Sequence, residues 1–152
     1  MALVDPFANL HILIIDDQEL HLDIIEAMLL KIGVAKVIRA KSGADAIAAI
    51  KTAARAVDCT ICDYRMENGN GLEFLKYVRM GQAKSLRADA CIILLTASTD
   101  VGIIQTAGEL DANAYLVKPV TPDKLKAAIE RARSRYFPIN FDKYSRVILP
   151  VG

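Results

Sequence analysis

Short apolar segments alternate with segments of helical periodicity along the whole chain. Each apolar segment is rich in Ile, Leu, Val and Cys and is too short for a buried helix, so it reads as a strand buried on both faces. Alternation of this kind calls for a parallel sheet with helices on both faces and right-handed crossovers. The sequence therefore predicts an α/β fold with a doubly wound, five-stranded parallel sheet, whose strands lie in residues 10–15, 34–40, 56–63, 91–95 and 114–117.

A helix is predicted after each strand. Ser42, Asn70 and Thr121 are suited to cap the second, third and fifth helices. The fourth helix contains Gly102 and Gly108, and each glycine costs about 1 kcal/mol relative to alanine. Helical spacing predicts these inward-facing residues: Ile24, Met28 and Ile32 in the first helix, Ala46, Ile47, Ile50 and Ala54 in the second, Leu72, Leu75 and Val78 in the third, Val101, Ile104 and Ala107 in the fourth, and Leu125, Ile129 and Ala132 in the fifth.

Length and composition narrow the class of protein. With 152 residues, there is room for one domain with a full-sized core. The 19 basic and 18 acidic residues nearly cancel, which gives no support for direct binding of nucleic acid. No apolar run approaches the roughly 18 residues that span a bilayer, and residues 1–9 lack the basic region of a signal peptide. A cytoplasmic protein without membrane insertion is expected.

Cys59 and Cys62 match the spacing C-x-x-C, which is found in zinc and redox sites. Both lie on one predicted strand, where residues three apart point to opposite faces of the sheet. They cannot converge on a metal, so we interpret them, with Cys91, as small buried side chains in a reducing compartment.

Polar side chains follow four of the predicted strands. Asp16 and Asp17 follow the first, Asp63 ends the third, Thr96 follows the fourth, and Lys118 follows the fifth. Because the carboxyl ends of parallel strands meet at one edge of a sheet, where ligands bind, these side chains are expected to lie together. Two carboxylates about 4 Å apart repel by about 4 kcal/mol at an effective dielectric constant near 20, so the cluster needs a cation or a raised pKa.

A hard divalent cation with oxygen ligands, such as Mg²⁺, fits this set best. Asp63 could then attack a phosphoryl group, because carboxylates form covalent phospho-intermediates. Lys118, Thr96 and the cation would neutralise the phosphoryl oxygens. The alternative interpretation is three solvated loop aspartates and an unrelated lysine.

Asp16-Asp17, Asp63, Thr96 and Lys118-Pro119 together resemble the receiver domain of two-component response regulators, of flavodoxin-like (βα)5 fold, over about residues 9–136. In that family, the equivalent of Asp63 takes a phosphoryl group from the histidine of a kinase. The expected type is a single-domain, chemotaxis-type receiver.

The resemblance also implies roles for individual residues. The predicted metal site is Asp16, Asp17, Asp63 and the backbone carbonyl of Arg65, with Asp16 just outside the ligands that the family uses. The equivalents of Thr96 and Lys118 contact the phosphoryl oxygens, Thr96 and Tyr115 form the switch, Arg65 and Ser98 tune the lifetime of the phosphoryl group, and the peptide bond before Pro119 is cis.

Three other residues receive weaker interpretations. Tyr64 either gates the site or lies at its rim. His11 and His21 have no carboxylate or cysteine at ligand spacing, so they are interpreted as structural or solvated.

The resemblance implies a phosphorylation-activated signalling switch and not an enzyme, although it assists its own phosphoryl transfer and dephosphorylation. The expected phosphodonor is a histidine kinase or a histidine phosphotransfer protein. The expected output is binding of a downstream protein at the face formed by the fourth helix, fifth strand and fifth helix, within residues 100–135.

Other functions compete with this one. A Mg²⁺-dependent phosphatase of the haloacid dehalogenase type needs an aspartate two residues after its nucleophile, but Gln18 follows Asp16 and Glu19 follows Asp17 at that spacing. A flavodoxin-type carrier needs a phosphate loop rich in hydroxyls and glycine after the first strand, where this chain is acidic. A third alternative is a receiver fragment of a longer regulator.

Residues 137–152 lie outside the predicted receiver domain, residues 1–136, and are called the tail below. Phe137, Ile139 and Phe141 alternate with polar residues or proline, which is a strand-like pattern. The tail is too apolar for a solvated segment, so it is expected to pack on its own domain or on a second copy in a homodimer. The nearest surface is the fifth helix, where the tail would lie on the predicted output face; a truncated linker is the alternative.

Overall fold

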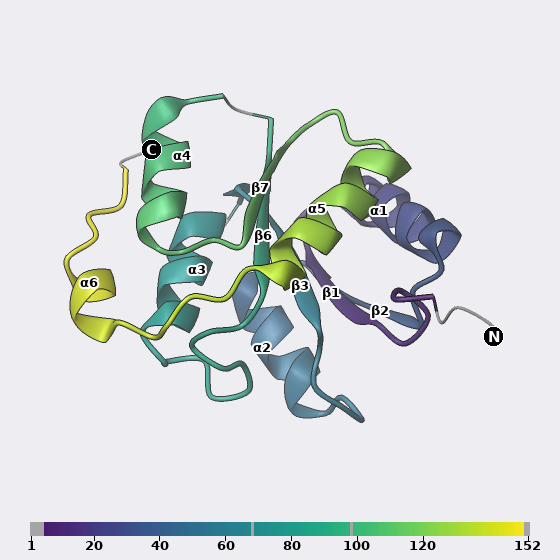
Figure 1. Cartoon of the computed structure of the whole chain (residues 1–152), viewed down its shortest axis with the longest axis horizontal. Helices are drawn as coiled ribbons and strands as arrows, with labels where there is room; N and C mark the ends of the chain where they lie inside the picture. The colour runs from purple at the N-terminus through teal and green to yellow at the C-terminus, as the bar shows by residue number, and fades with distance from the viewer. Residues whose placement is uncertain (1–4, 68, 98, 151–152) are drawn as a thin grey trace.

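The computed structural model describes residues 5–67, 69–97 and 99–150. Its main sheet has five parallel strands in the order β2-β1-β3-β6-β7 (Figure 1). Their bounds are β1 (His11–Ile15), β2 (Lys36–Ala40), β3 (Cys59–Asp63), β6 (Ile92–Thr96) and β7 (Ala114–Val117). The predicted α/β class, strand number and parallel pairing are confirmed.

Helices cover both faces of the sheet. Helices α1 (Glu19–Ile32) and α5 (Pro122–Ser134) pack on one face, over a core that contains Ile12, Ile14 and Ile93. Helices α2 (Gly43–Lys51), α3 (Gly71–Arg79) and α4 (Val101–Glu109) pack on the other face, over Leu13, Ile15 and Leu94. Successive strand residues therefore feed two separate cores, which explains why the strands are apolar without alternation.

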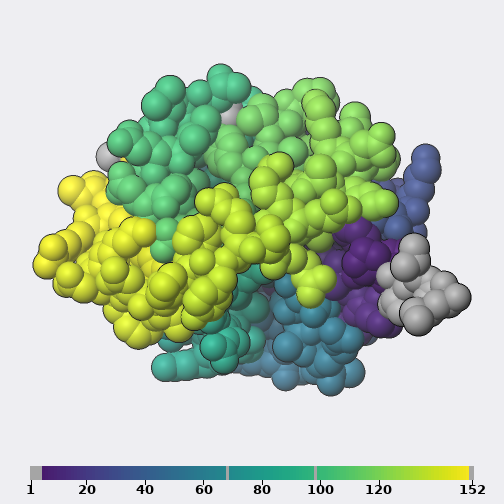
Figure 2. All heavy atoms as spheres, in the orientation of Figure 1, coloured from purple at the N-terminus to yellow at the C-terminus, as the bar shows by residue number. Residues whose placement is uncertain are grey.

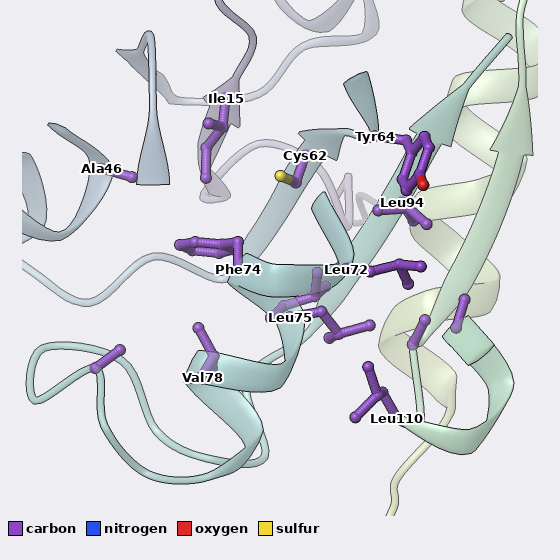
Figure 3. Packing of buried hydrophobic residues seen from close by; sticks show 14 of the residues in the cluster. Ile15, Ala46, Cys62, Tyr64, Leu72, Phe74, Leu75, Val78, Leu94 and Leu110 are labelled. Carbon is purple, nitrogen blue, oxygen red and sulfur yellow. The ribbon is translucent and has the colours of Figure 1, made fainter. Parts of the chain in front are cut away.

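Figure 3 shows how α3 fills the second of these cores. Leu72 and Leu75 point toward Leu94 of β6 and Leu110, while Phe74 and Val78 lie toward α2 and the loop after α3. The face of α3 that was predicted from spacing is the one that is buried.

The inward faces predicted for α1 and α4 are right only in part: Ala107 is buried, and Met28 and Ile32 are partly buried against the core, but the other predicted residues are exposed. Leu22, Ile25 and Leu29 are the buried residues of α1, whereas Ile24 is 45% exposed. In α4, Ile103, Thr106 and Ala107 are buried, and Val101 and Ile104 are exposed. Both helices carry apolar residues around most of their circumference, so periodicity alone does not identify the side that meets the sheet. Helix α2 ends at Lys51, which leaves Ala54 outside it.

The pairing register aligns the carboxyl ends of the central strands. Ile15 pairs with Cys62, and Asp63 pairs with Leu95. After β3, the chain forms a small antiparallel hairpin of β4 (Arg65–Met66) and β5 (Gly69–Asn70), which was not predicted. The hairpin brings Gly71 so close to the sheet that a Cβ atom there would lie 2.8 Å from the backbone oxygen of Asp63. A side chain at this position would push α3 away from β3.

The tail contains a helix, so its strand-like interpretation is wrong. Residues 135–140 form no strand, and α6 (Phe141–Ser145) follows them. The side chain of Asn140 caps α6 by accepting a hydrogen bond from the backbone N–H of Lys143. This local bond competes successfully with an extended conformation.

The surface predicted for the tail, the fifth helix, is also wrong. Tyr144 and Val147 are buried in the core that lies under α2, α3 and α4, on the face of the sheet opposite to α5. Figure 1 places α6 beside α3, and Figure 2 shows the tail, in yellow, covering the end of the molecule below α4. The tail therefore covers apolar surface on the side of the sheet that carries α2, α3 and α4.

Polar contacts hold the tail within α6 and just after it. The Tyr144 hydroxyl donates to Asp111 Oδ2 at 2.7 Å, and Lys143 Nζ donates to Asp111 Oδ1 at 2.8 Å. Lys76 Nζ donates to the backbone oxygen of Val147 at 2.7 Å. Burial and the neighbouring Asp111 carboxylate raise the pKa of Tyr144 to about 12, so its hydroxyl keeps the donated proton at neutral pH.

Substitution of Tyr144 by Phe is expected to destabilise the protein by about 1–3 kcal/mol, because it leaves a buried carboxylate with one donor fewer. Chemical denaturation measures the change. Tyr136→Phe is the matched control, since Tyr136 is 75% exposed and should give no measurable change. Equal stability of Tyr144→Phe and the wild type would show that this hydrogen bond does not hold the tail.

Within the described residues, no helix has the length and apolar character needed to cross a bilayer.

Candidate functional site

Three carboxylates, a hydroxyl and an ammonium are brought to the carboxyl edge of the sheet, as the strand order requires. Asp16 and Asp17 directly follow β1, and Asp63 is the last residue of β3. Thr96 ends β6, and Lys118 follows β7. Since β1, β3, β6 and β7 are neighbours in the sheet, residues far apart in the sequence become neighbours in space.

Asp16 and Asp63 form the buried centre of this site. Their exposed fractions are 5% and 6%. Lys118 Nζ lies 2.9 Å from Asp63 Oδ1 and 3.8 Å from Asp16 Oδ2, so one ammonium serves two carboxylates. When both carboxylates are ionised, the single positive charge of Lys118 does not neutralise them, and the cluster keeps a net negative charge.

Burial raises the pKa of Asp63, and the carboxylate of Asp16 adds to the increase. The hydrogen bond and charge of Lys118 act in the opposite direction. The loss of hydration therefore destabilises the ionised form of Asp63 by more than Lys118 stabilises it. A second cation at this site would relieve the excess charge.

Asp17 points toward the hairpin. Its Oδ2 accepts a hydrogen bond of 2.7 Å from the backbone N–H of Glu67, in the hairpin that also holds Arg65. In residues 5–67, 69–97 and 99–150, no group of three His, Cys, Asp or Glu side chains is positioned to hold a metal ion. The oxygen donors at this edge are nevertheless of the type that a hard divalent cation prefers, and Asp17 could join them by giving up its bond to Glu67.

His21 belongs to the site, although we interpreted it from the sequence as structural or solvated. Its Nδ1 lies 3.2 Å from Asp16 Oδ2 and 3.4 Å from Lys118 Nζ. The available signal was its position in the first turn of the helix that directly follows Asp17, on the side that faces the strand ends.

Thr96 of β6 and Tyr115 of β7 are diagonal neighbours on adjacent strands. Partial burial raises the pKa of the Tyr115 phenol, and the Thr96 side chain opposes that shift. Thr96 is 1% exposed, and Tyr115 is half-buried on β7. A movement of the Thr96 side chain would therefore change the surroundings of the Tyr115 ring.

Three further residues near the site had roles predicted from the sequence. Tyr64 is 2% exposed and packs in the core, so it neither gates the site nor lies at its rim. The Lys118–Pro119 peptide bond is cis. Ser98 lies outside the described residues.

An apolar cleft opens beside the carboxylates, between α1 and the loop from β7 to α5. Asp16, His21 and Lys118 lie at its polar end. Ile24, Met28 and Val120 are among its apolar lining residues. A group that reaches Asp63 from this side would cross a largely apolar surface.

Comparison with known proteins now identifies the family. Residues 12–130 match the sequence model of the response regulator receiver domain. The chain belongs to this family. Phosphorylation on aspartate and use of Mg²⁺ are general to receiver domains, which act as signalling switches in two-component systems.

Individual relatives agree with the receiver assignment. A probable chemotaxis protein CheY of Rhizobium etli is 41% identical over 70 residues, which are 46% of this chain and 52% of that protein. A CheY homologue of Campylobacter jejuni is 38% identical over 74 residues, or 49% of this chain and 55% of that protein. The matched region thus spans about half the length of these relatives.

The structure of the chemotaxis response regulator CheY4 of Vibrio cholerae superposes with a TM-score of 0.68 at 28% identity. The match covers 82% of this receiver chain and 98% of CheY4. A receiver domain protein of Clostridium thermocellum gives a TM-score of 0.70 at 28% identity, over 82% of this chain and 94% of that protein.

Proposed function

We propose that the chain is a signalling switch that accepts a phosphoryl group on Asp63. The donor is a histidine kinase or a histidine phosphotransfer protein. The result is binding of a downstream protein at the surface formed by α4, β7 and α5. The observation that carries this proposal is the contact of Lys118 Nζ with Asp63 Oδ1, at 2.9 Å, on a carboxylate that is almost fully buried.

In the proposed transfer, a carboxylate oxygen of Asp63 forms a bond to phosphorus. The bond from phosphorus to the donor's imidazole nitrogen breaks, and the nitrogen leaves with the electron pair. Lys118 is already adjacent to the attacking carboxylate and can follow the phosphoryl oxygens as charge moves onto them. The Thr96 hydroxyl, at the end of the neighbouring strand, is proposed as a second contact.

Asp16, Asp17, Asp63 and the Arg65 backbone carbonyl are proposed to hold Mg²⁺. Bound Mg²⁺ would supply positive charge to the phosphoryl oxygens. Asp17 would give up the hydrogen bond that it accepts from the backbone N–H of Glu67 and bind the metal instead. Metal binding would therefore release this contact of the hairpin with the site.

Mg²⁺ is expected to stabilise the fold, because it binds the native carboxylates and not the unfolded chain. At about 100 times its dissociation constant, the gain should be about 2.7 kcal/mol. Melting curves with and without Mg²⁺ measure it. Asp63→Asn should reduce the gain, whereas Asp123→Asn, at the exposed start of α5, should not. Identical wild-type curves would remove the metal from this proposal.

Transmission to the output surface is proposed to run from Thr96 to Tyr115, its diagonal neighbour on β7. When Thr96 turns toward a phosphoryl group, it vacates space into which the Tyr115 ring can turn. Helix α4 is suited to follow, because Gly102 and Gly108 weaken it. Val101 and Ile104 lie exposed on α4 and are available to a partner.

Fluorine NMR of protein labelled with 3-fluorotyrosine tests this route, because the chain has only five tyrosines. Phosphorylation by acetyl phosphate should shift the Tyr115 resonance, which Tyr115→Phe identifies. The exposed Tyr136 is the internal control and should not shift. Thr96→Ala should accept the phosphoryl group but lose the Tyr115 response. An unchanged Tyr115 resonance in phosphorylated wild-type protein would exclude the route.

A second candidate is a receiver that forms one part of a longer regulator. The cyclic di-GMP phosphodiesterase response regulator of Xanthomonas campestris is 42% identical over 74 residues, which are 49% of this chain and 19% of that protein. Immunoblotting of source cells with an antibody to this chain separates the two candidates. A band of 16.6 kDa favours the single-domain switch, and a much larger band favours the longer regulator.

A further inference from the structure

Two thiols touch at the edge of the sheet opposite to Asp63. Cys59 begins β3, and Cys91 immediately precedes β6, the neighbouring parallel strand. Their Sγ atoms are 3.4 Å apart. Cys59 is 1% exposed, whereas Cys91 is partly exposed. The third thiol, Cys62, lies in the core on the opposite face of the sheet, as its spacing from Cys59 predicted.

We infer that Cys59 and Cys91 are a site of reversible oxidation that forms a disulfide by exchange with a low-molecular-weight disulfide. A disulfide has an S–S distance of about 2.05 Å, so the sulfurs must approach by about 1.4 Å. Neighbouring strands lie about 4.7–4.9 Å apart, within the range of about 4.4–6.8 Å between Cα atoms that a disulfide spans. Small side-chain rotations can therefore close the bond without unpairing the strands.

The different exposure of the two thiols assigns their order of reaction. Cys91 can meet a small molecule from solvent, and Cys59 cannot. The pKa of Cys91 is lowered because the Cys59 thiol can hydrogen-bond to its thiolate and because Arg133 of α5 adds positive charge, whereas partial burial opposes this shift. The same contact and burial raise the pKa of Cys59. Cys91 is thus the attacking thiol, and Cys59 resolves the adduct.

With oxidised glutathione as the reagent, the exchange balances in two steps. The Cys91 thiolate attacks one sulfur of glutathione disulfide, a mixed disulfide forms, and one glutathione thiolate leaves. The Cys59 sulfur, after loss of its proton, then attacks the Cys91 sulfur, and the second glutathione thiolate leaves. The protein loses two hydrogens, and one glutathione disulfide becomes two glutathione thiols.

Such a bond would tie β3 to β6 at the end remote from phosphorylation. Cys59 lies four strand positions before Asp63, or about 13 Å at about 3.3 Å per residue. Oxidation and aspartate phosphorylation can therefore occupy the same molecule. The cross-link also restricts the conformations of the unfolded chain between residues 59 and 91, so the oxidised protein is expected to melt at a higher temperature.

The test treats the whole folded chain with oxidised glutathione and measures intact mass without reductant. The expected product has lost two hydrogens, yields a peptide joined through Cys59 and Cys91, melts at a higher temperature, and reverts with dithiothreitol. Cys62→Ala is the matched control and should behave in the same way. Cys59→Ala should stop at a stable glutathione adduct on Cys91, and Cys91→Ala should not react.

Several results would overturn the inference. They are a persistent glutathione adduct on Cys91 in the wild type, no reaction in the folded protein, a disulfide that contains Cys62, or an oxidised product with a lower melting temperature. None of these results depends on whether Asp63 accepts a phosphoryl group, so the inference fails separately from the proposed function.

Discussion

Asp63→Asn is expected to abolish phosphorylation of this chain. Incubation of the wild type with acetyl phosphate and Mg²⁺ should raise its intact mass by one phosphoryl group, and the variant should gain none. The amide of asparagine is a poor nucleophile, while its shape and volume preserve the packing of the residue. The loss should therefore be complete and not a partial slowing.

The other carboxylates of the site provide the contrast. Asp16 is as buried as Asp63, but its Oδ2 lies 3.2 Å from His21 Nδ1 and farther than Asp63 from Lys118. Asp16→Asn is expected to slow phosphorylation without changing its position. Asp123→Asn, on the exposed start of α5, should be phosphorylated as the wild type is. A phosphoryl adduct that persists in Asp63→Asn would place the acceptor elsewhere.

Arg79→Met is expected to cause the largest loss of stability of any single substitution proposed here, at least about 3 kcal/mol. Arg79 is 2% exposed, at the end of α3. Burial lowers the pKa of its guanidinium, which nevertheless remains charged at neutral pH. The side chain donates hydrogen bonds to the backbone oxygens of Ala88, Ala90, Leu110 and Asp111 and to Asn113 Oδ1.

These bonds explain the size of the effect. One guanidinium supplies donors to the loop after α3 and to the turn between α4 and β7, including the backbone of Asp111, which accepts the tail through its side chain. Methionine has similar length but no donor, so several buried carbonyl groups would lose their partners together. Lysine would retain the charge but cannot reproduce the planar, divergent donors.

Arg87→Met is the matched control for Arg79→Met. Arg87 is also an arginine with a polar partner, since its Nε lies 2.9 Å from Asp89 Oδ1, but its side chain is 80% exposed. Solvent screens such a pair, so little change in unfolding by urea is expected. Similar midpoints for Arg79→Met and the wild type would show that the network contributes little to stability.

Strand-end residues were the part of the site that the sequence predicted well. Asp63 and Thr96 end apolar runs, while Asp16 and Lys118 follow them, and a parallel sheet brings such ends together. The order of strands and helices is sufficient to place these residues. Side-chain packing is not required, because the backbone direction of each strand already delivers the next residue to the common edge.

Helix faces were predicted less well, because they depend on neighbours that are distant in sequence. Leu72, Leu75 and Val78 form one clear stripe on α3, and that stripe is buried. On α1 and α4, apolar residues surround the helix, and the buried side overlaps only in part with the one that spacing suggested. Ile24 and Val101 are left exposed, next to the cleft and on the proposed output surface respectively.

The sequence by itself determined the α/β class, the order of the elements and the residues that meet at the carboxyl edge of the sheet. These features follow from local periodicity and strand direction, which each segment carries in its own residues. Only the tertiary structure decided the packing of the tail on the α3 side, the contacts of Arg79, the place of His21 beside Asp16 and the contact of Cys59 with Cys91. Most of these contacts join residues from segments that are far apart in the sequence. The residues of one segment alone do not indicate which other segment it will contact.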